Sequence, residues 1–149
     1  MHRESQIRRF EQALAVLREQ FPGLRIESVP ASGGLDAAAE IPRQNGLDFD
    51  VSINLQNFDE LHLNASNFWV EWFPCDEEEV FSRFIEACVS LLSGRGRLVE
   101  SYLGDRAVSS RLEVPLENGS WRGLATWSNL FAFIPWRRRV VLVQNRPRA

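Results

Sequence analysis

Residues 48–65, DFDVSINLQNFDELHLNA, determine the class of fold to which this chain belongs. Over most of this stretch apolar and polar residues alternate, which is typical of antiparallel strands with one buried and one wet face. A short polar loop interrupts the alternation, and matching the apolar faces on its two sides pairs Ile53 with Leu63. The same register sets Asn54 opposite His62 on the polar face. The sequence therefore predicts an antiparallel hairpin here.

The segment that follows, residues 68–73 (FWVEWF), is apolar on nearly both faces. Its buried parity is opposite to that of the preceding strand, so residues 65–67 are predicted to hold a bulge or a turn. A strand that is apolar on both faces needs a cover on its second face. We therefore expect Trp69 and Trp72 to point to opposite sides of the sheet.

Two helices are predicted outside this region. Residues 4–20 carry apolar residues three and four positions apart, which forms one stripe on a helix, and residues 76–93 carry a wider stripe. Asp76 and Glu79 have the spacing of a capping box, which predicts Asp76 as the N-cap of the second helix. Residues 30–46 are rich in Gly, Ala and Pro and predict a long surface loop.

Turn signals organise the remainder of the chain. Gly104-Asp105 and Asn118-Gly119 each predict a two-residue hairpin turn, and residues 138–143 predict a last strand. Counting outward from the second turn predicts three cross-strand pairs on one face, namely Leu116–Trp121, Val114–Gly123 and Leu112–Ala125.

The segregation of helices and strands predicts an α+β fold. We expect one mostly antiparallel sheet of about six to eight strands with two helices packed on one face, in the order α-β(3–4)-α-β(4). The length of 149 residues fits a single domain, 1–149, with the loop at about 30–46 and a C-terminal tail at about 145–149.

All 17 basic residues are arginine, and the chain has no lysine. Schiff-base enzymes, pyridoxal-phosphate enzymes and P-loop nucleotidases all need a lysine, so these classes are excluded. The charge is distributed unevenly. Residues 26–94 hold two arginines against 13 acids, whereas residues 95–149 hold ten arginines against four acids. Such opposite regions attract each other within the fold, attract a second copy, or meet different partners.

The sequence gives no sign of a cofactor or a metal centre. Cys75 and Cys88 have no ligand spacing with the two histidines, and the acidic residues near position 50 lack the spacing of an EF-hand. The N-terminus lacks the apolar stretch of a secretory signal, and no apolar run is long enough for a bilayer. We therefore expect a cytoplasmic protein that uses no cofactor, no metal and no membrane.

One candidate site is a pocket near His62. The predicted register places this histidine on the polar sheet face, and Asp50 and Glu71 are acids on neighbouring strands. A histidine oriented by a carboxylate is a general base in many enzymes. The alternative is a solvated histidine on a strand, which is the more common situation, and no nucleophile motif accompanies His62.

A second candidate is a set of aromatic and basic residues suited to a protein interface. Tryptophan and arginine are enriched in interfaces and at their energetic centres. The residues concerned are Trp69, Trp72, Trp136, Arg137, Arg138 and Arg139. The three arginines also suit phosphate contacts, but the net charge of −3 argues against bulk affinity for nucleic acid. Trp136 follows an apolar run in a predicted loop, and we expect it to be exposed.

Two stretches, residues 68–79 (FWVEWFPCDEEE) and 119–122 (GSWR), resemble segments of small uncharacterised bacterial α+β proteins. This resemblance implies no activity and transfers no catalytic residue. The predicted layout is also similar in architecture to secretion chaperones and toxin-immunity proteins.

The sequence thus favours a non-enzymatic protein-binding module that is chaperone-like, immunity-like or regulatory and that binds a protein partner or a second copy. An enzyme or small-ligand binder with a pocket at His62, Asp50 and Glu71 is the first alternative. Nucleic-acid binding through the C-terminal arginines is the second.

Overall fold

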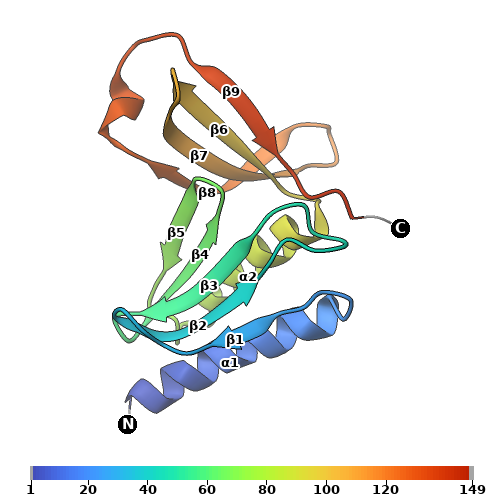
Figure 1. Cartoon of the computed structure of the whole chain (residues 1–149), viewed down its shortest axis with the longest axis vertical. Helices are drawn as coiled ribbons and strands as arrows, with labels where there is room; N and C mark the ends of the chain where they lie inside the picture. Colours follow the sequence, from blue (N-terminus) through green and yellow to red (C-terminus); the bar gives the residue numbers. More distant parts are fainter. Residues whose placement is uncertain (1, 148–149) are drawn as a thin grey trace.

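The computed structural model describes residues 2–147, and within them the chain forms two long helices and nine strands in two antiparallel sheets (Figure 1). The sheets and α1 follow one another along the long axis of the molecule, with α1 at one end and the second sheet at the other. The predicted α+β class is confirmed, but the prediction of a single sheet is wrong.

The first sheet has five strands in the order of the chain. Its strands are β1 (Glu27–Val29), β2 (Leu35–Ile41), β3 (Val51–Gln56), β4 (Glu60–Ala65) and β5 (Phe68–Trp72). The register of β3 and β4 pairs Ile53 with Leu63 and Asn54 with His62, as the apolar alternation predicts. A tight turn at Ser66 then connects β4 to β5 and changes the buried parity.

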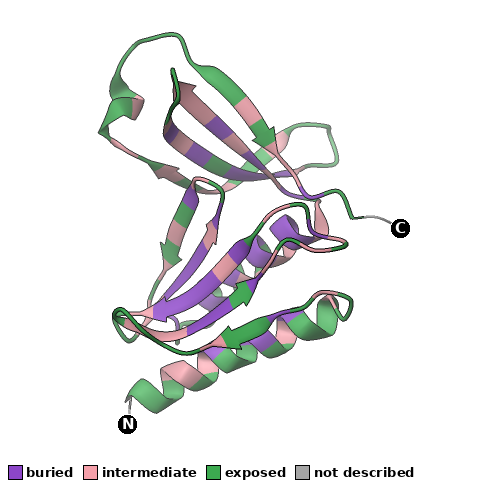
Figure 2. Ribbon diagram, in the orientation of Figure 1, coloured by how far each residue is buried: buried purple, intermediate pink, exposed green. Residues whose placement is uncertain are grey.

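Helices α1 (His2–Gln20) and α2 (Glu78–Ser93) cover one face of the first sheet, and their apolar stripes form the main core with it. Buried residues are concentrated on β2, β3, β4 and α2 (Figure 2). The largest fully buried side chains of this core come from both helices and four strands, and include Phe10, Leu14, Ile41, Ile53, Leu63, Phe68 and Phe84. Within residues 2–147, no helix combines the length and the apolar character needed to cross a bilayer.

The second sheet has the order β8-β7-β6-β9. Its strands are β6 (Arg97–Leu103), β7 (Arg106–Pro115), β8 (Trp121–Ser128) and β9 (Arg139–Val143). It joins the main core through Leu98 and Leu112. Strands β5 and β8 belong to different sheets because no strand ladder joins them, and this break divides the predicted single sheet into two.

The connection between the sheets contains a buried carboxylate. Glu100 on β6 is fully buried and accepts hydrogen bonds from the Asn67 side chain (2.6 Å) and the Tyr102 hydroxyl (2.8 Å). Burial on its own raises the pKa of Glu100, but hydrogen bonds from Ser66, Asn67 and Tyr102 outweigh it and hold the pKa below its ordinary value. These bonds fasten the turn between β4 and β5 to the second sheet.

Hydrogen bonds of a buried polar side chain also hold the C-terminal part of the described chain in place. Asn145 is buried, and its amide donates to the carbonyls of Gly46 (2.8 Å) and Leu92 (2.7 Å). Its side-chain oxygen accepts from the Asp48 backbone (3.1 Å). The predicted tail therefore begins as a fixed segment between α2 and the loop before β3. Residues 148 and 149 of that tail lie outside the described residues.

Three local predictions are wrong. The predicted loop at 30–46 contains β2, because pairing with β1 and β3 outweighs the low strand propensity of its three alanines. Helix α2 begins two residues after Asp76, since the first helical carbonyl is that of Glu77, which accepts from Phe81. Asp76 is therefore not the N-cap.

The third correction concerns the hairpin of β7 and β8. Of the predicted pairs, only Leu112–Ala125 is present. Nearer the turn the register differs by one residue, because the Leu116 amide bonds the Ser120 carbonyl around a three-residue loop. A bulge that adds Leu124 restores the predicted register farther from the turn.

Candidate functional site

The connection between β8 and β9 projects from the second sheet (Figure 1). It begins with a short 3-10 helix, η1 (Leu130–Phe133). The side chain of Asn129 caps this helix by accepting from the Phe131 backbone (3.1 Å), and its amide donates to the Ala107 carbonyl (3.1 Å). The Asn129 backbone also donates to the Val108 carbonyl. These bonds to β7 hold the base of the segment in place.

The segment from Leu130 to Leu142, here called segment 130–142, is strongly apolar and strongly exposed. Leu130, Phe133 and Trp136 are 85%, 82% and 75% exposed. The colouring of Figure 2 shows exposure along most of the path into β9. Seven of the eleven exposed large apolar side chains among the described residues lie in it, the others of this segment being Phe131, Ile134, Val140 and Leu142. Contiguous exposure of this kind marks interaction surfaces in folded proteins.

Strand β9 adds an open sheet edge to this surface. It pairs with β6 on one side and with no described strand on the other. Val140 and Leu142 are more than half exposed. An edge strand of this type offers unpaired backbone groups and apolar side chains together, which suits pairing with another chain.

The three arginines of the predicted basic cluster are all exposed, but they have different partners. Arg138 donates to the Ala132 carbonyl, and Arg139 lies over the Tyr102 ring at 4.7 Å from its centroid. The first contact lies within segment 130–142, and the second holds the segment to β6. Arg137 forms no hydrogen bond or ion pair with another described residue, so its guanidinium is available to a partner.

The structure does not bring the predicted aromatic residues onto one surface. Trp72 lies on the helix side of β5 and packs edge-on against Phe84, with 5.6 Å between the ring centroids. Trp69 points to the other side of the strand and is 52% exposed. Trp136 is exposed in segment 130–142, as expected from its place in a loop. Trp72 therefore belongs to the core, whereas Trp69 and Trp136 lie at the surface.

His62 is buried, and both of its ring nitrogens have a partner. The indole N–H of Trp69 donates to Nδ1 (2.8 Å), and Nε2 lies 3.2 Å from the Glu60 carboxylate. Because Nδ1 accepts, the neutral ring carries its proton on Nε2 and donates it to Glu60. A general base needs a free nitrogen that reaches the substrate, and His62 offers none in this arrangement.

The acids of the predicted pocket are divided between two places. Glu71 lies directly across the β4–β5 ladder from His62, and both side chains line one groove on this face of the sheet. Asp50 is exposed just before β3, where its carboxylate accepts from the Arg43 backbone (2.7 Å). It adjoins Asn64 at the far end of the strands rather than His62. The predicted trio is therefore a pair, His62 and Glu71, and Glu60 takes the position expected for the orienting carboxylate.

The cysteines contribute no reactive group. Both are buried and neither forms a disulfide. Burial raises the pKa of Cys75 to about 11 and raises that of Cys88 as well, so both remain protonated thiols at neutral pH. Among residues 2–147, no group of three or more His, Cys, Asp or Glu side chains is arranged to hold a metal ion.

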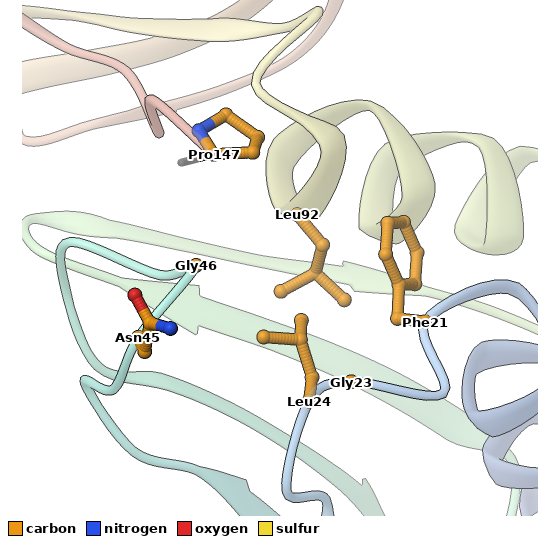
Figure 3. A pocket seen from close by; sticks show the side chains of 7 residues that line it. All are labelled: Phe21, Gly23, Leu24, Asn45, Gly46, Leu92 and Pro147. Carbon is orange, nitrogen blue, oxygen red and sulfur yellow. The ribbon is translucent and has the colours of Figure 1, made fainter. Parts of the chain in front are cut away.

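A separate pocket of about 300 Å³ lies where α1 ends, beside the last turn of α2 (Figure 3). Its side chains are mainly apolar and come from the chain after α1, the loop before β3, α2 and the C-terminal segment, namely Phe21, Leu24, Asn45, Leu92 and Pro147. No ionisable side chain among residues 2–147 lines it. The described part of the pocket therefore has no group for acid–base chemistry.

The sequence pattern indicated Trp136 and the arginines as binding residues but not the apolar residues around them. The run of five apolar residues at 130–134, between a polar strand end and a proline, was the available signal. Comparison of the chain with known protein families, with curated proteins and with solved structures finds no match. The geometry of the surface is therefore the main guide to function.

Proposed function

We propose that this chain is a non-enzymatic protein-binding module and that a partner protein covers segment 130–142. The observation that carries the proposal is the exposure of seven large apolar side chains along one segment whose base is hydrogen-bonded to β7. Covering such a surface removes apolar area from water, which stabilises a complex by about 25 cal/mol for each Å² buried. The hydrogen bonds at the base of the segment lower the entropy cost that a fully free loop would add on binding.

The composition of the segment supports a protein as its partner. Tryptophan and arginine are enriched at the energetic centres of protein interfaces, and phenylalanine is enriched in interfaces generally. The apolar side chains fit an apolar groove, and the free guanidinium of Arg137 fits an acidic residue at its rim. Nucleic acid fits less well, because two of the three arginines are held by contacts within the chain.

An enzyme or small-ligand binder at His62 is a weaker proposal. The side chain is 4% exposed and both nitrogens are engaged, by Trp69 and Glu60. A substrate has access only to the acids and indoles around it. These groups suit binding better than proton transfer.

Site-specific photocrosslinking in the host cell tests the proposal. A photoreactive phenylalanine analogue replaces Phe133 in one version of the protein and Leu116, another exposed apolar residue, in a control version. We expect one protein to be crosslinked at position 133 and not at position 116, and to be lost when Trp136→Ala is added. Equal crosslinking at both positions, or none at position 133, would overturn the proposal.

A further inference from the structure

A groove of about 420 Å³ lies on the polar face of the first sheet, beside the second sheet. Strands β4 and β5 form its floor, and Trp127 from β8 forms part of its wall. The lining side chains are Gln56, Asn57, Glu60, His62, Trp69, Glu71 and Trp127. Its described lining contains two indole rings, two carboxylates and no arginine.

The groove is electrically negative. Glu60 is engaged by His62 and by the Asn57 amide (2.9 Å), but Glu71 is exposed and forms no hydrogen bond or ion pair with another described residue. It belongs to the part of the chain in which acids outnumber arginines by 13 to two. Elsewhere on the same sheet face, burial and the nearby charge of Asp50 both raise the pKa of Glu40. A negative face of this kind attracts a cation.

The aromatic part of the groove is fixed in position. The hydrogen bond from Trp69 to His62 Nδ1 holds the indole in one orientation, while half of its surface remains open to solvent. Trp127 is partly buried and borders the groove together with Trp69. The faces of indole rings attract arginine more strongly than those of other aromatic side chains. A preorganised ring also loses little entropy when a ligand binds.

The chain combines arginine, a carboxylate and an aromatic ring at three other places, and at two of them the arginine lies within 4 Å of the ring centroid. Arg97 lies 3.6 Å from the ring centroid of Trp121 and bonds Glu113 at 2.8 Å. At the second place, an arginine lies 4.0 Å from a phenylalanine centroid and bonds a glutamate at 2.6 Å; these residues are Arg9, Phe81 and Glu78. The groove presents the carboxylate and the rings without the arginine.

We propose that this groove binds the guanidinium group of an arginine side chain presented by a partner protein, between the indoles of Trp69 and Trp127 and against Glu71. The inference rests on the proposed function only in taking the arginine from a protein, because its residues differ from those of segment 130–142. Trp127 precedes η1 by three positions in the sequence, so this wall of the groove lies near the start of segment 130–142.

Titration of the full chain with N-acetyl-arginine amide, followed by the indole N–H resonances in NMR spectra, tests the proposal without any partner. The resonances are assigned with Trp69→Phe and Trp127→Phe. We expect saturable shifts of the Trp69 and Trp127 signals, with the Trp72 signal unchanged. The citrulline analogue has a similar shape but no charge, and we expect it to produce no saturable shift.

Glu71→Gln removes the charge while keeping the shape of the side chain, and Glu117→Gln makes the same change at an exposed turn away from the groove. We expect Glu71→Gln to weaken arginine binding about fivefold, the upper range for an exposed ion pair, and Glu117→Gln to leave it unchanged. The proposal is overturned if arginine shifts neither indole, if citrulline shifts them equally, or if both variants bind arginine like the wild type. None of these results bears on crosslinking at position 133.

Discussion

The two sheets of this molecule differ in how far their apolar side chains are buried. Two helices cover one face of the first sheet, and Ile53 and Leu63, which face these helices, have at most 1% exposure. Among residues 2–147, no helix covers the face of the second sheet that points away from the core, and β9 and η1 carry apolar side chains that are exposed to water. The comparison indicates that the first sheet supplies most of the stability, whereas the second sheet presents a surface.

The sheets also differ in the way they are fastened. Apolar packing against α1 and α2 holds the first sheet. The second sheet is joined to it partly by polar contacts, chiefly those of Glu100 and Asn145. Hydrogen bonds to buried polar groups are directional, so they fix the position of the second sheet even where apolar contacts are few.

The largest difference between the regions is expected for a phenylalanine in each. Phe84→Ala removes a ring with no exposure, and we expect the free energy of unfolding to fall by about 3–5 kcal/mol. Phe133→Ala removes a ring that is 82% exposed, and we expect a change within about 0.5 kcal/mol. Urea unfolding measures both. Similar losses for the two variants would contradict the conclusion that the first sheet supplies most of the stability and the second sheet presents a surface.

The next effect concerns Gly94, which ends α2 with a φ of 76°. A Cβ at this position would lie 2.1 Å from the Asn145 carbonyl oxygen, so Gly94→Ala must displace the fastened C-terminal segment. We expect a loss of about 3 kcal/mol in the free energy of unfolding. Gly119→Ala has a similar φ of 83° but meets no atom within 4 Å, so it serves as the control with a loss of about 1 kcal/mol. Equal losses, measured by thermal unfolding, would contradict a role for the Asn145 contact.

The hydrogen bonds of Glu100 predict that the free energy of unfolding depends on pH. Because its hydrogen bonds lower the pKa of Glu100 in the folded state, the ionised carboxylate stabilises the fold above the unfolded pKa, and this contribution is lost as the pH falls through the folded pKa. We expect Glu100→Gln to cost about 2 kcal/mol at pH 7 and less below about pH 4. Urea unfolding of both proteins across this pH range gives the difference. A difference that does not change with pH would show that ionisation of Glu100 is unimportant.

The smallest stability changes are expected for substitutions of two arginines in segment 130–142, Arg137 and Arg139. Arg139→Gln loses the contact with the Tyr102 ring, and we expect a stability loss of about 0.5–1 kcal/mol. Arg137→Gln removes no contact with a described residue, so we expect a change within about 0.5 kcal/mol. Partner crosslinking at position 133 should nevertheless be weaker in Arg137→Gln. Unchanged crosslinking would assign the binding to the apolar residues alone.

The sequence predicted best the parts in which local pattern and packing agree. The alternation around Ile53 and Leu63 gave the correct register, because a shift by one residue would expose every apolar side chain. Strand β2 was missed because Ala37, Ala38 and Ala39 have low strand propensity and are held by the neighbouring strands. The turn after Leu116 was misjudged because turn length and the compensating bulge leave little trace in the residue pattern.

The candidate site and the connection between the sheets were less predictable, because their contacts join residues that lie apart in the sequence. Nothing near Glu100 in the sequence indicates that Asn67, 33 residues earlier, will satisfy its carboxylate. In the same way, the hydrogen bond from Trp69 to His62 depends on the pairing of β4 with β5. Exposure of segment 130–142 follows from the absence of a covering element among the described residues, which a local apolar run does not reveal.

The most direct test of the account is native mass spectrometry of the tagged protein recovered from its own host. Wild type is compared with a double variant, Phe133→Ser with Trp136→Ser, whose melting temperature is checked first. We expect the wild type to carry a stoichiometric protein, either a partner or a second copy, and the equally folded variant to lack it. A wild type recovered as a bare monomer, or the same complex in the variant, would contradict the assignment of segment 130–142 as a binding surface.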